Sequence, residues 1–271
     1  MVGASCGTVA ANVIDTHCHL TGDRYKGGLG AILTTAREAG LSAMIAVAVD
    51  VEDAYAAQSL SEAEPDVWCT AGVHPSEAGR DHNLEQLEQL ISHPRCLAWG
   101  EMGLDGHWPD PALPAQRALF EAQLAVVKQV DGLGGALKPI ILHSRRAVEE
   151  VLETLKRVGI CGSRCVFHCF TEGPELIHPV LAFGAHVSFT GVVTYRNAAD
   201  VAAASDEVPL DRLMVETDSP YLTPEPHRGT WPNEPANVVH VSHYLAARRG
   251  MSNADFEAAT DATAQSFFGV P

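Results

Sequence analysis

The stretch VIDTHCHL, residues 13–20, leads from two β-branched apolar residues into three polar side chains spaced two apart, Asp15, His17 and His19. Residues at i, i+2 and i+4 of an extended strand point to the same side, so the spacing predicts that these side chains project together. One interpretation is a half-buried strand whose polar face meets water. We favour the other, in which two imidazoles and a carboxylate converge on a metal ion.

The same kind of segment recurs along the chain. Apolar, β-branched segments of strand length are separated by longer segments of helical period and by turn residues. The eight predicted strands span residues 13–19, 41–49, 67–73, 96–104, 138–143, 164–170, 185–191 and 213–219. Strand and helix alternating eight times is the pattern of a closed (β/α)₈ TIM barrel, an α/β fold. An open doubly wound sheet is the weaker alternative.

The helical segments between these strands support one barrel rather than two domains. Residues 31–40, 83–92, 115–130 and 147–159 have helical period, and glycine closes several of them. Two further segments, 236–250 and 253–268, follow the last strand, which predicts an additional C-terminal helix. No repeat, linker or low-complexity tract divides the chain, so we expect a single domain over residues 13–271.

The N-terminal residues 1–12 have neither a basic start nor an extended apolar centre, so we expect a leader rather than a secretory signal. No apolar run reaches the length of a membrane helix. Seven cysteines without an export signal indicate reduced thiols and a cytoplasmic protein. Cys161, Cys165 and Cys169 recur every four residues, as zinc ligands can. Cys165 and Cys169 fall in a predicted strand, however, where free cysteine packs as a small hydrophobe.

The charge balance restricts how the protein could meet nucleic acid. The chain has 18 Lys and Arg against 34 Asp and Glu, a net charge of −16. An acidic surface repels phosphate backbones at long range, so tight nonspecific binding of duplexes is not expected. Metals and a few arginines would have to attract any nucleic-acid substrate locally.

Ionisable side chains collect at the C-terminal ends of the predicted strands. They are His17, His19, His74, Glu101, Asp105, His143, His168 and Asp218. The C-terminal ends of all strands of a barrel meet at one mouth, where active sites are built. Taken singly, each residue could be a satisfied core histidine or a buried acid paired with arginine.

The coincidence of so many charges at one apolar mouth favours a metal centre, because uncompensated buried charges are costly. Two divalent cations would offset the carboxylates and use the imidazoles as neutral ligands. Such ligands suit Zn²⁺ or Mn²⁺, with Mg²⁺ an option where oxygen and water dominate. Paired metals activate water and stabilise charge developing on a phosphoryl or carbonyl oxygen, so hydrolysis is the expected reaction.

Eight ordered blocks of the sequence carry a family resemblance. They read DTHCHL, GVHP, GEMGLD, LHSRRA, FHCFTEG, SFTGVVTYRNA, ETDSPYLTP and RGTWPNEP. These blocks resemble the signature of the TatD family of metal-dependent deoxyribonucleases, within the amidohydrolase-like metallohydrolases. The likeness runs from about residue 13 to the C-terminal helix.

The resemblance implies a centre of two divalent metals, Mg²⁺, Mn²⁺ or Zn²⁺. Its ligands would be His17, His19 and Asp218 at one ion, His143 and His168 at the other, and Glu101 bridging both. Asp218 would also orient or deprotonate the attacking water. Asp218 and Glu101 would therefore be the catalytic residues.

The resemblance also places His74 near the substrate rather than at a metal. It makes Arg145, Arg196 and Arg228 candidates for phosphate contacts, since a guanidinium fork matches phosphate oxygens. A surface salt bridge is the alternative for each arginine. Arg196 stands where the family commonly has lysine, which keeps the charge and changes its geometry.

Two further features bear on the site. Gly106 and His107 stand where family members usually carry aromatic residues, so substrate contacts there are expected to differ. Asp15 and Glu216 share the inward face of their predicted strands with the ligands. We expect them to be partners of metal-binding histidines, with ordinary buried hydrogen-bonded acids as the alternative.

The leading functional hypothesis is a two-metal phosphodiesterase acting on DNA, on single-stranded ends that can enter the barrel mouth. A family member that removes D-amino acids from mischarged tRNA is the main alternative. A cyclic-amide hydrolase with a carboxylated lysine is disfavoured, because Lys138 starts a strand rather than ending it. A non-catalytic scaffold would show damaged ligand positions, and all six are intact. We expect a monomer.

Overall fold

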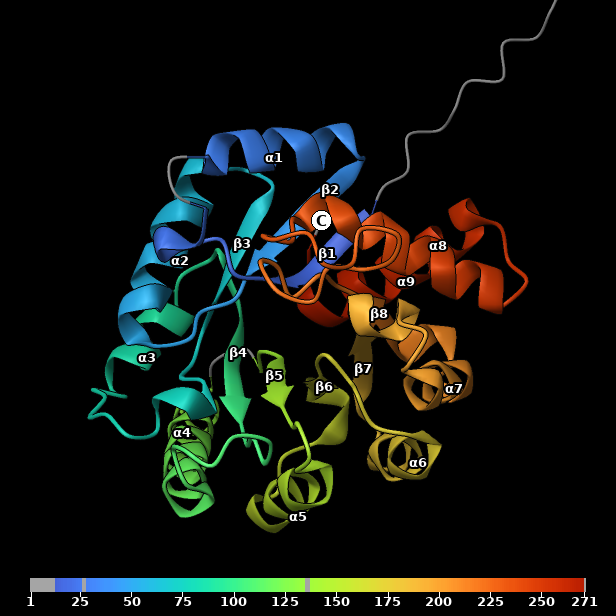
Figure 1. Ribbon diagram of the computed structural model, residues 1–271. Coiled ribbons are helices and arrows are strands. Elements are labelled where there is room, and N and C mark those ends of the chain that lie inside the picture. The colour runs from blue at the N-terminus through green and yellow to red at the C-terminus, as the bar shows by residue number, and fades with distance from the viewer. Residues whose placement is uncertain (1–12, 26–27, 135–136, 271) are drawn as a thin grey trace, which may run out of the picture.

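The computed structural model describes residues 13–25, 28–134 and 137–270. The expected leader, residues 1–12, lies outside these ranges. Parallel strands form one sheet whose order follows the sequence, and the sheet curves into a nearly closed barrel (Figure 1). The strands are β1 (Val13–Cys18), β2 (Leu41–Ala46), β3 (Val67–Ala71), β4 (Cys96–Gly103), β5 (Ile140–His143), β6 (Cys165–Phe167), β7 (His186–Phe189) and β8 (Leu213–Val215).

A single parallel bridge between Cys18 and Ser219 joins β1 to the segment that follows β8. The first and last strands therefore meet, as they do in a barrel and not in an open sheet. The predicted (β/α)₈ TIM barrel is confirmed.

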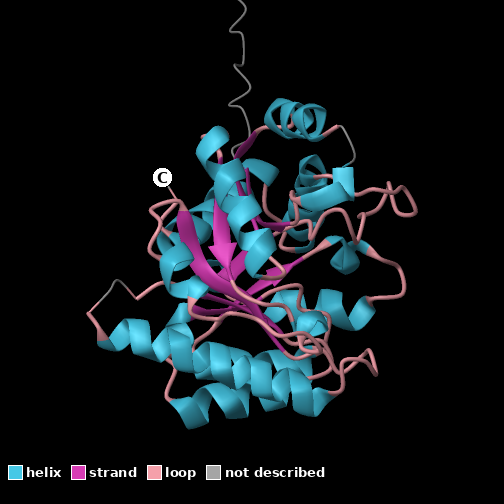
Figure 2. Ribbon diagram, turned by 90° about the vertical axis from the view of Figure 1, so that its left-hand side faces the viewer, coloured by secondary structure: helices cyan, strands magenta, loops and turns pink. Residues whose placement is uncertain are grey.

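Helices surround the strands on the outside (Figure 2). They are α1 (Leu29–Glu38), α2 (Val51–Ala63), α3 (Gln86–Ile91), α4 (Leu113–Gly132), α5 (Val148–Val158), α6 (Pro174–Phe183), α7 (Ala199–Glu207), α8 (Val238–Arg248) and α9 (Asn253–Phe268). The sequence periodicity did not single out α2, α6 or α7. Helices α2 and α7 are rich in alanine and carry no sustained apolar stripe. None of the described helices is both long and apolar enough to cross a membrane.

All eight strands are shorter than the predicted segments, and three of the differences bear on the site. The eighth ends at Val215, three residues before Asp218, because Asp218 adopts a left-handed conformation with φ of 53° that leaves the sheet ladder. The sixth ends at Phe167, so the placement of Cys169 in a strand was wrong, and Cys169 has φ of 45°. The fifth begins at Ile140, after Lys138.

The extra C-terminal helix closes one end of the barrel. Ala264 and Phe268 of α9 pack against inward-facing residues near the strand starts, including Ile14 and Met214. The backbone N–H of Ile14 donates a 3.0 Å hydrogen bond to Oδ1 of Asp261 on the same helix. Because α9 covers the N-terminal ends of the strands, the functional side chains are left to the opposite, C-terminal mouth.

Candidate metal centre

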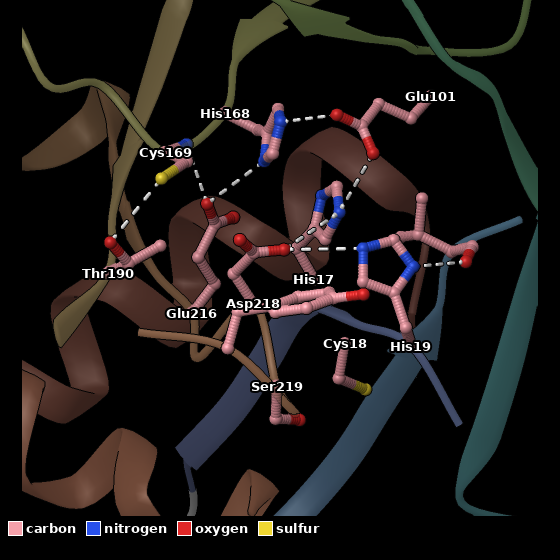
Figure 3. Close-up of polar contacts among 12 residues, drawn as sticks. His17, Cys18, His19, Glu101, His168, Cys169, Thr190, Glu216, Asp218 and Ser219 are labelled. Atoms are coloured by element: carbon pink, nitrogen blue, oxygen red, sulfur yellow. Dashed lines mark hydrogen bonds and ion pairs between the residues drawn. The ribbon is translucent and has the colours of Figure 1, made fainter. Parts of the chain in front are cut away.

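The six side chains predicted as ligands meet at the C-terminal mouth, although they lie in or just after five different strands. Five of them, His17, His19, Glu101, His168 and Asp218, are turned toward one another in Figure 3. The sixth joins the same group from the end of β5. The prediction that these positions gather at one rim is therefore confirmed.

Glu101 lies at the centre of this group and is 1% exposed. Its Oε1 is 2.6 Å from Nε2 of His168 and 2.7 Å from Nδ1 of His143. Its Oε2 is 3.3 Å from Nε2 of His17. The two oxygens of one carboxylate therefore face imidazoles on two sides, which is the arrangement that a bridging ligand requires.

Asp218 approaches His17 of β1, and His19 just after β1, from the other side. Its Oδ1 is 3.3 Å from Nε2 of His19 and 3.7 Å from Nε2 of His17. The turn that presents Asp218 is fixed by the preceding residue, since the N–H and the hydroxyl of Thr217 both donate to Asp15, at 2.9 and 2.6 Å. The side chain of Asp218 is 15% exposed, so it reaches toward the open mouth.

The donor atoms form three groups that could each hold a cation, each with its atoms within 4.8 Å of one another. The groups are His17, His168 and Asp218; His17, His19 and Glu101; and His74, Glu101 and His143. Nδ1 of His17 is buried without a hydrogen-bond partner, and its Nε2 faces the carboxylates of Glu101 and Asp218 at 3.3 and 3.7 Å. Unpaired buried polar atoms are rare in folded proteins and call for an explanation. A divalent cation, bound by neutral imidazoles and carboxylates, supplies one.

The carboxylates of the site and one of its histidines have the protonation states that bind metal. Burial alone would raise the pKa of Glu101, but the facing histidines, His168 first, hold this pKa well below its ordinary value. Burial likewise opposes ionisation of Asp218, yet His19 and His17 keep its pKa low. Burial lowers the pKa of His17. The carboxylates are therefore ionised, and His17 is neutral. Burial also disfavours the charged forms of His168 and His143, but Glu101 raises the pKa of His168, and Asp105 together with Glu101 raises the pKa of His143, so a bound cation would replace a proton on each of these two rings.

His74 lies closer to the centre than its expected role beside the substrate requires. Its Nε2 is 3.2 Å from Nδ1 of His143 and 3.5 Å from Oε1 of Glu101. Ser76 orients the ring, with its hydroxyl 2.7 Å from Nδ1. The GVHP motif does not predict the contact between His74 and Ser76, because Ser76 follows the motif.

Asp105 was noted at the end of β4 without a role, and the structure gives it one. Its Oδ2 is 3.0 Å from Nε2 of His143. Burial raises the pKa of Asp105, but its hydrogen bond with His143 outweighs this and lowers the pKa to about 2. Asp105 is therefore a carboxylate that orients His143, whose Nδ1 faces Glu101.

The two acids expected behind the ligands differ. Oε1 of Glu216 lies 3.4 Å from Nδ1 of His168 and accepts from the backbone N–H of Cys169 at 2.7 Å (Figure 3). This supports the expectation for Glu216. Asp15 instead binds Thr217 and meets His17 only through the backbone N–H, at 3.3 Å. The pairing of β1 with β2 shifts register between Asp15 and Cys18, so strict alternation fails there.

The three candidate arginines lie at the surface, and none forms an ion pair with a described residue. Arg145 is close enough to Asp105 to help lower its pKa. The guanidinium of Arg228 lies 3.8 Å above the ring of Tyr195, and its Nη1 donates to Asn197 at 3.0 Å. Arg196 is exposed. Within the described part of the chain, the salt-bridge alternative finds no support.

Gly106, the first of the two unusual residues after β4, has a steric explanation. A Cβ on Gly106 would lie 2.7 Å from the carbonyl oxygen of Arg146, so a side chain cannot be accommodated there without a backbone shift. The ring of His107 packs edge-on to Trp108, with centroids 4.7 Å apart.

Lys138 donates to the carbonyl oxygen of Ile91 at 2.6 Å. It is thus engaged before the start of β5, away from the mouth.

Comparison with known proteins adds to this geometry. The family model described as "TatD related DNase" matches residues 14–269. The chain is 32% identical over 260 residues to the uncharacterized metal-dependent hydrolase YabD of Bacillus subtilis, covering 95% of this chain and 99% of that protein. It is 33% identical over 246 residues to the 3′-5′ ssDNA/RNA exonuclease TatD of Edwardsiella piscicida, covering 88% and 92%. The crystal structure of YJJV, a TatD homolog from Escherichia coli, superposes with a TM-score of 0.88 at 28% identity, covering 97% and 100%.

Proposed function

Because the chain belongs to the TatD family of metal-dependent hydrolases, we propose that it is a two-metal phosphodiesterase that shortens single-stranded DNA from an end. The observation that carries the proposal is the position of Glu101, whose two oxygens face His143 and His168 on one side and His17 on the other. A carboxylate so placed is suited to bridge two ions. The relative named as a single-strand exonuclease supports the substrate.

The ligand assignment comes from the family resemblance. His17, His19 and Asp218 would hold one ion, His143 and His168 the other, and Glu101 both. The donor groups within 4.8 Å divide these side chains differently, since His168 also lies with His17 and Asp218, and His74 with Glu101 and His143. Divalent cations in such a pair polarise a phosphoryl oxygen and lower the pKa of a nearby water. Asp105 and Glu216 behind His143 and His168 would fix the ring orientations, as carboxylates behind metal-binding histidines do.

The remaining chemistry falls to this chain's own side chains. Asp218 is ionised and reaches the open mouth, so it is placed to accept a proton from the water that attacks phosphorus. The water oxygen forms a new bond to phosphorus, the bond to the leaving nucleotide oxygen breaks, and solvent protonates that oxygen. Arg145, Arg196 and Arg228 would contact phosphates, and His74 would lie beside the scissile group.

An incubation with two substrates tests the proposal. End-labelled single-stranded DNA and D-aminoacyl-tRNA are each supplied with Mg²⁺, Mn²⁺ or Zn²⁺, and an RNA strand is added as a third arm because the relative's name includes RNA. We expect shortening of DNA that an Asp218→Asn variant loses and an Asp81→Asn variant retains, since Asp81 is exposed. Release of the amino acid with the DNA left intact would replace the nuclease by the deacylase.

A further inference from the structure

Two large aromatic side chains beside the candidate metal centre are exposed. Tyr221 is 46% exposed and Trp231 is 64% exposed. Their ring centroids are 5.6 Å apart, with the ring planes inclined by 48°. They are among the few large hydrophobic side chains that the described surface presents. Large exposed aromatic surface next to a functional site is typical of binding surfaces.

The backbone ties this pair to the ligands. The N–H of Tyr221 donates to the carbonyl oxygen of Asp218 at 3.0 Å, and the Tyr221 ring lies 6.2 Å from the ring of His19. A stacked group on Tyr221 would therefore be a direct neighbour of a substrate atom at the centre. This proximity distinguishes the pair from aromatic side chains scattered elsewhere on the surface.

The loop that carries Trp231 is held in place by a buried asparagine. Asn233 is fully buried. Its N–H donates to the carbonyl oxygen of Pro220 at 2.8 Å, and its side-chain amide donates to the carbonyl oxygen of Tyr221 at 2.6 Å. The backbone at Tyr221 is thus tied to the loop two residues beyond Trp231. A preorganised surface binds with a smaller loss of conformational entropy than a mobile one.

The same loop adds a cation that phosphate could use. Arg228 is exposed and stacked on Tyr195, and the Tyr195 hydroxyl anchors the loop by donating to the carbonyl oxygen of Thr223 at 3.0 Å. Flat aromatic surfaces combined with local positive charge are how proteins bind single strands without reading sequence. In a duplex the base faces are covered by their neighbours, so only an unpaired base can stack on such a pair.

We propose that Tyr221 and Trp231 form a stacking platform for an unpaired nucleobase adjoining the scissile phosphate, and that this platform selects single strands. The inference rests on the proposed nuclease function and adds to it the binding site for the base. Stacking on an aromatic side chain contributes roughly 5- to 150-fold in affinity for each base. Loss of the platform should therefore appear in KM for base-bearing strands.

Steady-state kinetics of the metal-loaded protein tests the platform. The substrates are a single-stranded oligonucleotide and the same strand with abasic terminal nucleotides. We expect Trp231→Ala to raise KM for the ordinary strand about tenfold, while kcat changes much less. The rise should be at least fivefold larger than the rise for the abasic strand. Trp231→Phe should restore most of the affinity, since phenylalanine keeps a flat ring.

A matched control is Leu133→Ala, because Leu133 is 78% exposed just after α4, away from the mouth, and should leave both KM values unchanged. Equal KM values for wild type and Trp231→Ala, with the wild type cleaving DNA, would overturn the platform and leave the nuclease intact. The same rise in KM on both strands would assign Trp231 a structural role and also overturn it. Failure of the wild type to cleave any nucleic acid would overturn both proposals.

Discussion

Oε1 of Glu101 lies 2.6 Å from Nε2 of His168, although Glu101 belongs to β4, His168 follows β6, and β5 lies between them. In a flat sheet, side chains two strands apart do not meet at this distance, because neighbouring strands are about 4.8 Å apart. The curvature of the barrel brings them together. The geometry of these donor atoms is therefore a consequence of barrel closure, and the proposed ligand set predicts how metal binding responds to single substitutions.

Glu101→Ala should reduce retention of both metals, whereas His168→Ala should mainly empty one site. The reason is that Glu101 faces imidazoles on both sides and His168 faces only one oxygen of that carboxylate. Metal per chain, measured by plasma mass spectrometry after gel filtration, checks the prediction. Glu149→Gln, on the exposed face of α5, is the control. Equal two-metal occupancy in all variants would contradict the ligand assignment.

Glu216→Gln should weaken metal binding about 10- to 100-fold without abolishing it, which is the usual loss when a carboxylate behind a metal-binding histidine is removed. Glu216 contacts the far nitrogen of His168 at 3.4 Å and does not belong to any of the three donor groups. Titration against a competing chelator measures the change. An unchanged affinity would show that Glu216 serves to bind Cys169 and Thr16, which also contact it, rather than to orient His168.

The sequence predicted the barrel and its six converging side chains because both depend on order alone. Strand and helix alternation determines the topology, and the topology places every strand end at one mouth. Local deviations from regular strands were not predictable. The register shift in β1 turns Asp15 to Thr217 rather than to a histidine ring, and the left-handed turn at Asp218 shortens β8. Neither the register shift nor the left-handed turn can be recognised in the alternation of apolar and polar residues, because both depend on contacts with neighbouring strands.

His74→Ala distinguishes a substrate contact from a metal ligand. Our assignment beside the substrate predicts that KM for DNA rises several-fold while metal content stays at the wild-type value. The ring lies 3.5 Å from Oε1 of Glu101, so a metal role is the competing outcome. Metal content and KM are measured on the same preparation. Ser76→Ala, which removes only the hydroxyl at Nδ1, should give a smaller rise in KM. Loss of metal in His74→Ala would move this residue into the ligand set.

At the other end of the barrel, Asp261 of α9 accepts the N–H of Ile14, and burial, with a smaller contribution from Glu257, raises its pKa from 3.8 to about 7. The folded state therefore resists ionisation of Asp261. The unfolded chain releases this proton near pH 4 and the folded protein near pH 7, so stability falls as pH rises between these values.

Asp261→Asn should remove this dependence, because the amide oxygen can still accept from Ile14 and carries no proton to lose. Relative to wild type, the free energy of unfolding of the variant should rise by about 1 to 3 kcal/mol between pH 5 and pH 8. Urea titrations at several pH values, followed by circular dichroism, measure the difference, and metal effects cancel when both proteins are treated with the same chelator. Asp81→Asn, at an exposed position, should track wild type at every pH. A constant difference between Asp261→Asn and wild type across the range would mean that Asp261 is ionised in the folded protein, and that its bond to Ile14 is a charged one.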